Sequence, residues 1–121
     1  MGTWGSGVFE SDSASDFLDE AIRKLTHEIV FFLSDETLTG LPSAARDQVA
    51  AAADILALWC EHYETFPNVS KKVVRRWREV YLQQFDTDKA WDKEDSDVRT
   101  QRRKVIETTF ARLEAVATQE D

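Results

Sequence analysis

Residues 43–68 read SAARDQVAAAADILALWCEHYETFPN, and this stretch decides the fold class. Its apolar residues recur every three or four positions, at Ala45, Val49, Ala52, Leu56, Trp59 and Tyr63. That spacing places them on one stripe of an α-helix. The run Val49-Ala-Ala-Ala-Ala53 adds helix propensity, and its small side chains let a neighbouring helix approach closely. We therefore predict a helix that Ser43 caps and that ends at Phe66-Pro67-Asn68.

The segment before this helix predicts another amphipathic helix. Its apolar residues follow the same spacing, at Ala14, Phe17, Leu18, Ala21, Ile22, Leu25, Ile29 and Phe32. Ser13-x-x-Asp16 has the form of a capping box, and Asp12 is the alternative N-cap. We place the end of the helix near Leu33. The following Thr39-Gly-Leu-Pro42 is a clear break in the chain.

Two further helices are predicted after Pro67. Ser70 caps the first of them, whose inward side carries Val73, Trp77, Val80, Tyr81 and Gln84. The second runs from about Asp97 to Ala117, with Val98, Val105, Ile106, Phe110, Leu113 and Val116 inward. Residues 86–97 between them are a charged linker, which we expect to be solvated except for Trp91. No segment shows the sustained alternation of a strand, so the predicted fold is all-α. We expect one domain, residues 1–121, built as a compact bundle of four main helices.

The opening MGTWGSGVFESD, residues 1–12, holds three of the four glycines. Glycine permits positive φ and close backbone approach, and Trp4 and Phe9 are large apolar anchors beside this flexible run. Asp12 is placed to accept N–H bonds at the start of the first helix. We expect Trp4, Gly5, Gly7, Phe9 and Asp12 to form an N-terminal hook with Trp4 buried. The alternative is that the hook shapes a groove for a ligand.

This opening also resembles a small bacterial family of domains of unknown function. The match is carried by Met1-Gly2-Thr3-Trp4-Gly5-Ser6-Gly7-Val8-Phe9-Glu10-Ser11-Asp12, by Ala14, and by Asp16-Phe17-Leu18-Asp19-Glu20. Family members often carry Asn where this chain has Ser11, and their later Ala-rich helix is similar to residues 44–59. The resemblance implies a short, cytoplasmic, largely helical protein and brings no activity or cofactor with it.

Charge is distributed unevenly along the chain, which has a net charge of −8. Residues 1–70 hold 3 basic and 12 acidic residues, and residues 71–121 hold 12 basic and 11 acidic residues. An acidic half repels nucleic acid and anionic membranes and steers toward basic partners. No stretch approaches the ~20 apolar residues of a spanning helix, and no secretory signal opens the chain. We expect a soluble cytoplasmic protein that does not enter membranes.

Nine basic residues cluster in the last two predicted helices. They are Lys71, Lys72, Arg75, Arg76, Arg78, Arg99, Arg102, Arg103 and Lys104. If the clusters at 71–78 and 99–104 met, they would form a patch that grips phosphates. Because the sequence pI is about 4.7, we prefer the interpretation that these residues form salt bridges with the acidic half. The acidic partners we expect include Asp16, Asp19, Glu20 and Glu28.

The residue patterns predict no catalytic, metal or cofactor site. His27 and His62 are far apart, and the spacing of Cys60 and His62 points them to different sides of one helix. Asp86-x-Asp88 begins like a calcium loop, but the third ligand and the turn glycine are missing. No Gly-x-Ser-x-Gly occurs, and nothing local lowers the thiol pKa. We therefore expect a non-enzymatic acidic module, immunity- or regulator-like, that binds a basic protein. The alternative is a nucleic-acid-associated regulator that uses the two basic clusters.

Overall fold

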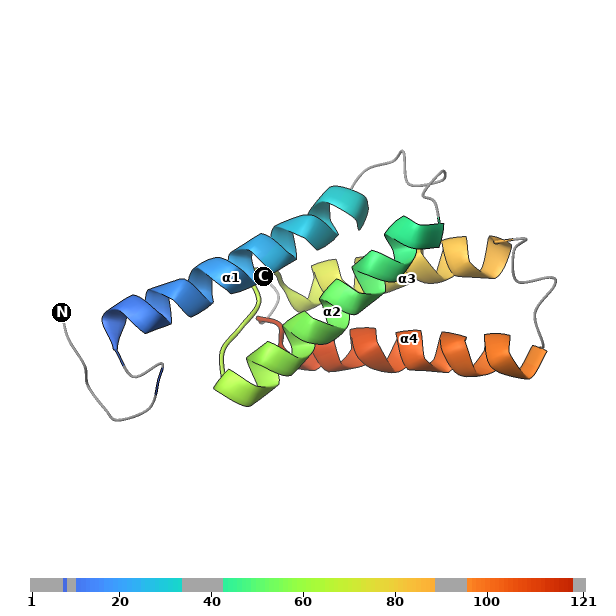
Figure 1. The fold of residues 1–121 in the computed structure, drawn as a ribbon. Helices are drawn as coiled ribbons and strands as arrows, with labels where there is room; N and C mark the ends of the chain where they lie inside the picture. Colours follow the sequence, from blue (N-terminus) through green and yellow to red (C-terminus); the bar gives the residue numbers. More distant parts are fainter. Residues whose placement is uncertain (1–7, 9–10, 34–42, 89–95, 119–121) are drawn as a thin grey trace.

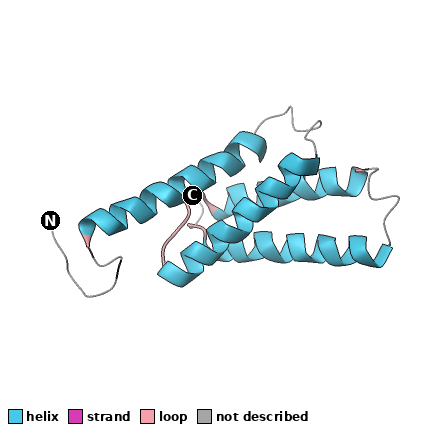
Figure 2. Ribbon diagram, viewed as in Figure 1, coloured by secondary structure: helices cyan, strands magenta, loops and turns pink. Residues whose placement is uncertain are grey.

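The computed structural model describes residues 8, 11–33, 43–88 and 96–118, and these form four α-helices (Figure 1). Helix α1 spans Asp12–Leu33, α2 spans Ser43–Tyr63, α3 spans Lys71–Thr87 and α4 spans Ser96–Val116. The described residues contain no strand (Figure 2), so the predicted all-α bundle is confirmed.

The helices form two antiparallel pairs, α1 with α2 and α3 with α4 (Figure 1). Helix α2 packs against both α1 and α4, whereas α3 packs mainly on α4 and meets α1 over a smaller area. The two pairs are therefore joined chiefly through α2 and α4. This arrangement decides which charged side chains can reach one another.

The core lies where the four helices meet. Its largest fully buried side chains include Trp77, Tyr81 and Phe110 from the second pair and Ile29 and Leu56 from the first. Burying a side chain such as Ile29, Leu56 or Phe110, relative to leaving it exposed, stabilises the fold by roughly 1.5–3 kcal/mol. The alanine-rich run contributes Ala52 and Ala53 to the same core, and Ala57 of α2 is buried there too.

Serine side chains cap the N-termini of α1 and α3. Ser70 caps α3 as predicted, because its hydroxyl accepts a hydrogen bond from a first-turn amide at 3.3 Å. At α1 both predicted N-caps, Ser13 and Asp12, are wrong. The hydroxyl of Ser11 accepts the hydrogen bond from the amide of Ala14 at 3.3 Å. Asp12 instead occupies the first turn of α1. Its carboxylate there lies at the positive end of the helix dipole.

The start of the predicted linker belongs to helix α3. Asp86 and Thr87 complete α3, Asp88 is its C-cap, and α4 begins at Ser96. Asp86 and Asp88 both form ion pairs with arginines, so these two residues are not the solvated ones that we expected. Residues 89–95, with Trp91, lie outside the described part of the chain.

Several side chains predicted to face inward are exposed. They are Phe17 (70%), Tyr63 (39%), Val73 (37%), Val98 (48%) and Val105 (59%). Phe17, Tyr63 and Val98 lie toward helix ends, where neighbouring helices no longer cover the stripe. Val73 and Val105 each lie one position before a buried residue, Val74 and Ile106 respectively. A repeat of 3.6 residues defines a stripe to within about one position, so packing decides between such neighbours.

Candidate protein-interaction surface

A row of acidic residues on α2 faces arginines of α4. Asp47 accepts a hydrogen bond from Arg102 at 3.3 Å. Arg112 donates to Asp54 at 2.8 Å and to Glu61 at 2.7 Å. The three carboxylates are spaced by seven residues and therefore lie in one line along α2. The prediction that the nine clustered basic residues pair with the acidic half is confirmed for Arg102. Arg112 lies outside the two predicted clusters, and Arg75, Arg76 and Arg103 pair with acidic residues of α3 and α4 instead.

This acidic row keeps an excess of negative charge. Arg112 serves both Asp54 and Glu61, so one guanidinium faces two carboxylates. Its hydrogen bond to Glu61 lowers the pKa of that carboxyl, and its positive charge acts in the same direction. The Glu61 carboxylate therefore stays ionised at neutral pH.

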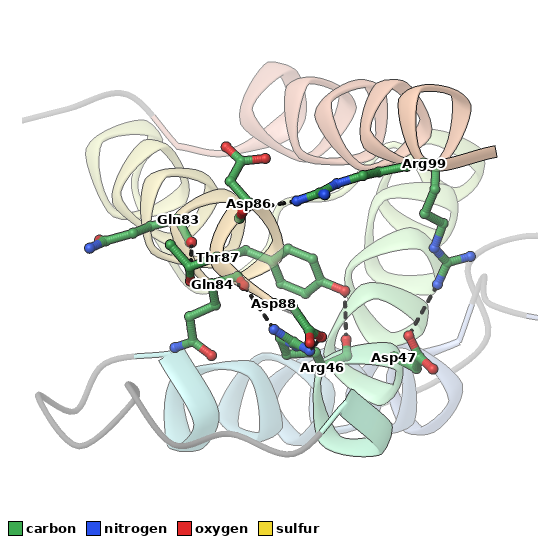
Figure 3. Close-up of polar contacts among 10 residues, drawn as sticks. Arg46, Asp47, Gln83, Gln84, Asp86, Thr87, Asp88 and Arg99 are labelled. Atoms are coloured by element: carbon green, nitrogen blue, oxygen red, sulfur yellow. Dashed lines mark hydrogen bonds and ion pairs between the residues drawn. The ribbon is translucent and has the colours of Figure 1, made fainter. Parts of the chain in front are cut away.

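A second polar cluster joins the start of α2 to the end of α3 (Figure 3). Arg46 is buried, forms an ion pair with Asp88 and donates to the backbone oxygen of Gln84 at 3.0 Å. The Tyr81 hydroxyl donates to the backbone oxygen of Arg46 at 2.9 Å. Burial raises the pKa of Tyr81 to about 12, so this hydroxyl remains a donor at neutral pH. The cluster is a structural link between the two helix pairs.

Asp86 links the same end of α3 to α4. Arg103 donates to the two carboxylate oxygens of Asp86 at 2.9 and 3.0 Å, and Arg99 donates to its backbone oxygen at 2.8 Å (Figure 3 shows the contact with Arg99). Arg103 also pairs with Glu107 at 3.1 Å. The hydrogen bonds from Arg103 hold the pKa of Asp86 below its ordinary value. The predicted basic cluster at 99–104 is therefore largely engaged within the protein.

The basic cluster on α3 is partly engaged as well. Arg75 pairs with Glu114 at 2.9 Å, and Arg76 pairs with Glu79 at 3.7 Å. Lys71 donates through Nζ to the backbone oxygens of Glu114 and Ala115 near the end of α4, at 2.7 and 3.2 Å. A cation in that position interacts favourably with the negative end of the helix dipole. Three of the nine basic side chains, Lys72, Arg78 and Lys104, form neither an ion pair nor a hydrogen bond with another described residue.

The prediction that acidic residues of α1 pair with the basic residues of α3 and α4 is wrong. Glu20 pairs with Arg23 of its own helix at 3.1 Å. Asp16, Asp19 and Glu28 are exposed, and within the described ranges none of them forms an ion pair with a basic residue of α3 or α4. The reason is the packing order, because α1 packs on α2 and only a small part of it meets α3. Helix α1 thus presents carboxylates to solvent.

The side of α2 that faces away from the core also carries apolar side chains. Ile55 and Leu58 are 39% and 53% exposed, and Ala51 and His62 on the same side are exposed too. We call these four residues the outer seam of α2. Their spacing of four, three and four positions is that of the contact positions in a coiled coil. Our sequence analysis identified only the apolar stripe of this helix that faces the core. The four, three and four spacing of the outer seam could also have been found in residues 51–62.

The described side chains include one buried cysteine and two exposed histidines. Cys60 is 1% exposed. Burial, with a smaller effect of the Glu61 charge, raises its pKa to about 11. A thiol in that state is a poor nucleophile at neutral pH. His27 and His62 lie on different helices and are exposed, and no group of three or more His, Cys, Asp or Glu in the described residues is placed to hold a metal.

Most of the predicted N-terminal hook lies outside the described residues. Trp4, Gly5, Gly7 and Phe9 belong to that part, so the burial of Trp4 stays a prediction. Asp12 begins α1 and is partly buried.

Comparison with known proteins places the chain in a family. Residues 2–120 match the family model described as "Domain of unknown function (DUF4259)", and the chain therefore belongs to that family. No curated protein and no solved structure matches it. In the described part of the chain, each helix is too short or too polar to cross a membrane.

Proposed function

We propose that this member of the family is a non-enzymatic interaction module whose acidic α1–α2 pair binds a basic protein. The observation that carries the proposal is how charge divides between the helix pairs. Helices α1 and α2 together hold 8 acidic and 3 basic residues, whereas α3 and α4 hold 10 basic and 5 acidic residues. Many basic side chains of α3 and α4 are engaged in contacts within the protein, while α1 exposes its carboxylates. The charge most available to a partner is therefore negative.

The non-enzymatic part of the proposal is supported by Cys60. It is the one cysteine of the chain, and it is buried with a raised pKa. The role we favour is that of an immunity protein or a regulator, which neutralises or controls a basic partner by covering its charged surface. Such a role needs a stable acidic surface and no reacting group.

Affinity capture tests the proposed function. The tagged full chain is incubated with native lysate of its source cell, and retained proteins are identified by mass spectrometry. We expect a stoichiometric basic partner whose retention falls as salt is raised, because salt screens exposed charges. The matched variant Asp16→Asn/Asp19→Asn/Glu28→Gln is expected to retain less of it. Recovery of no stoichiometric partner would contradict the proposal.

A nucleic-acid-associated regulator is the second candidate, and one observation favours it. Lys72, Arg78 and Lys104 form no ion pair with another described residue. Their positive charges could therefore pair with phosphate groups. The test is binding to mixed oligonucleotides at low salt. Binding that falls steeply with salt, and that Lys72→Ala/Arg78→Ala/Lys104→Ala abolishes, would favour this candidate over the first. Absence of binding at low salt removes it.

A further inference from the structure

The outer seam of α2 is an apolar helix face that the core does not use. Counted as heptads, Ile55 and His62 stand at a positions, and Ala51 and Leu58 stand at d positions. Isoleucine at a with leucine at d is the combination that two-stranded coiled coils favour. Ile55 and Leu58 are exposed although α2 already buries its opposite side in the core. Within the described part of the chain, the helix therefore has two apolar sides, and the core covers one of them.

The length of the seam suits a helix as its partner. From Ala51 to His62 it extends for about 17 Å along the axis, since an α-helix rises 1.5 Å per residue. That is about three turns. Side chains spaced by four and three positions form holes into which the side chains of a second helix insert. An extended strand offers side chains at a different period and does not match this row.

The acidic residues beside the seam favour a partner helix that is positively charged. Asp47, Asp54 and Glu61 occupy the g positions, which border the contact row and decide which partners pair in coiled coils. Three carboxylates are matched by two arginines of α4, Arg102 and Arg112, so the row stays net negative. Its carboxylates also remain partly exposed, at 68%, 54% and 39% along the row.

The C-terminal end of α2 adds negative charge beside the seam. Glu64 follows the helix directly and is exposed. The last carbonyls of a helix carry the negative end of its dipole. A lysine or arginine that approaches this end is therefore attracted both by the Glu64 carboxylate and by the negative end of the helix dipole.

We infer that the outer seam of α2 is the docking site for an amphipathic basic helix of a partner protein. Its apolar side chains would pack on Ile55 and Leu58, and its lysines or arginines would lie beside the acidic row. This inference rests on the proposed function and names the surface and the chemistry of the partner. A second copy of this chain is a poorer occupant, because a symmetric contact brings two net-negative α1–α2 pairs together.

The first test uses a synthetic probe with the full chain. The probe is a labelled peptide of about three heptads with leucine at a and d and lysine at e and g. The matched peptide carries glutamate at e and g, and charge repulsion keeps either peptide from pairing with itself. We expect fluorescence anisotropy to show binding of the lysine peptide at least about tenfold tighter than that of the glutamate peptide. Equal binding of the two peptides, or no binding of the lysine peptide, overturns the inference.

Two variants locate the binding site on the protein. Leu58→Lys places a charge in the seam and is expected to weaken binding of the lysine peptide by about tenfold or more. The matched control is Val73→Lys on α3, a partly exposed valine at 37% that lies outside the seam. Both changes are at exposed positions, and circular dichroism checks that both proteins fold. Equal effects of the two variants on peptide binding overturn the inference.

Two further outcomes separate the inference from the proposed function and from self-association. If lysate capture yields a basic partner that Leu58→Lys retains fully, the proposed function stands and the docking site is wrong. If the lysine peptide binds at the seam but no partner is captured, the proposed function fails and the seam stands. If sedimentation shows a dimer that Leu58→Lys dissociates, the occupant is a second copy and the inference is overturned.

Discussion

Arg46 on α2 and Asp88 at the end of α3 form an ion pair that is largely shielded from water. The two residues are 42 positions apart, and their side chains are only 9% and 15% exposed. The guanidinium also donates to the backbone oxygen of Gln84. Removing one member of a buried pair leaves the other charge without its partner, which costs more than the pair contributes when both are present.

We expect Arg46→Met to lower the free energy of unfolding by about 3 kcal/mol, because Asp88 loses its arginine. Urea denaturation measures the change. The double variant Arg46→Met/Asp88→Asn is expected to recover part of the loss. The matched control is Arg76→Met, whose ion pair with Glu79 is exposed. If the effects of Arg46→Met and Asp88→Asn, each measured alone, simply add up to the effect of the double variant, the two residues are not coupled.

Tyr81→Phe is expected to cost about 1 kcal/mol of unfolding free energy, because a buried hydrogen bond to the backbone of Arg46 is lost. The raised pKa gives a second measurement. The neutral hydroxyl stabilises the fold below the ordinary tyrosine pKa of about 10. This contribution is lost as pH rises through the folded pKa of about 12. Ultraviolet titration should show one tyrosine that ionises with a raised pKa, and this transition should be absent from Tyr81→Phe. If the transition persists in the variant, the raised pKa belongs to another tyrosine.

Acid should weaken the junction between α3 and α4. Arg103 lowers the pKa of Asp86, so the stabilising contribution is present above the ordinary aspartate pKa of about 4. It is lost as pH falls through the lowered pKa. Since both side chains are partly exposed, at 44% and 38%, we expect no more than about 1 kcal/mol from this pair. NMR titration of the Asp86 carboxyl in the wild type and in Arg103→Gln measures it. An identical pKa in both proteins would show that Arg103 is not the cause.

Cys60 should react with thiol reagents only when the protein unfolds. Its side chain is 1% exposed, and its pKa is raised to about 11. Because the thiolate is the reactive form, labelling at neutral pH is expected to be strongly suppressed in the native state and rapid in denaturant. The rate is followed by mass spectrometry, with Cys60→Ala as the unlabelled control. Native-state labelling as fast as that of a free cysteine would show that α2 opens readily.

The helices themselves are legible in the sequence because each depends on residues that are close along the chain. The alanine run of α2, the Ser70 cap and the break at Pro67 all act within a few positions. The same holds for the core residues Ile22 and Ile29, which share one stripe of α1. Local geometry is less informative at stripe edges, as Val73 and Val74 show, because neighbouring residues differ in direction by only part of a turn.

The sequence by itself determined four helices, an acidic half and the need for charge pairing within the protein. Only the tertiary structure decided that Asp54 and Glu61 meet Arg112, while Asp16 and Asp19 of α1 remain exposed. Periodicity specifies which side of a helix is apolar, but packing specifies which helix covers it. Because α2 lies against both α1 and α4, its acidic row reaches the arginines. Its outer seam lies on the remaining side and is exposed to solvent.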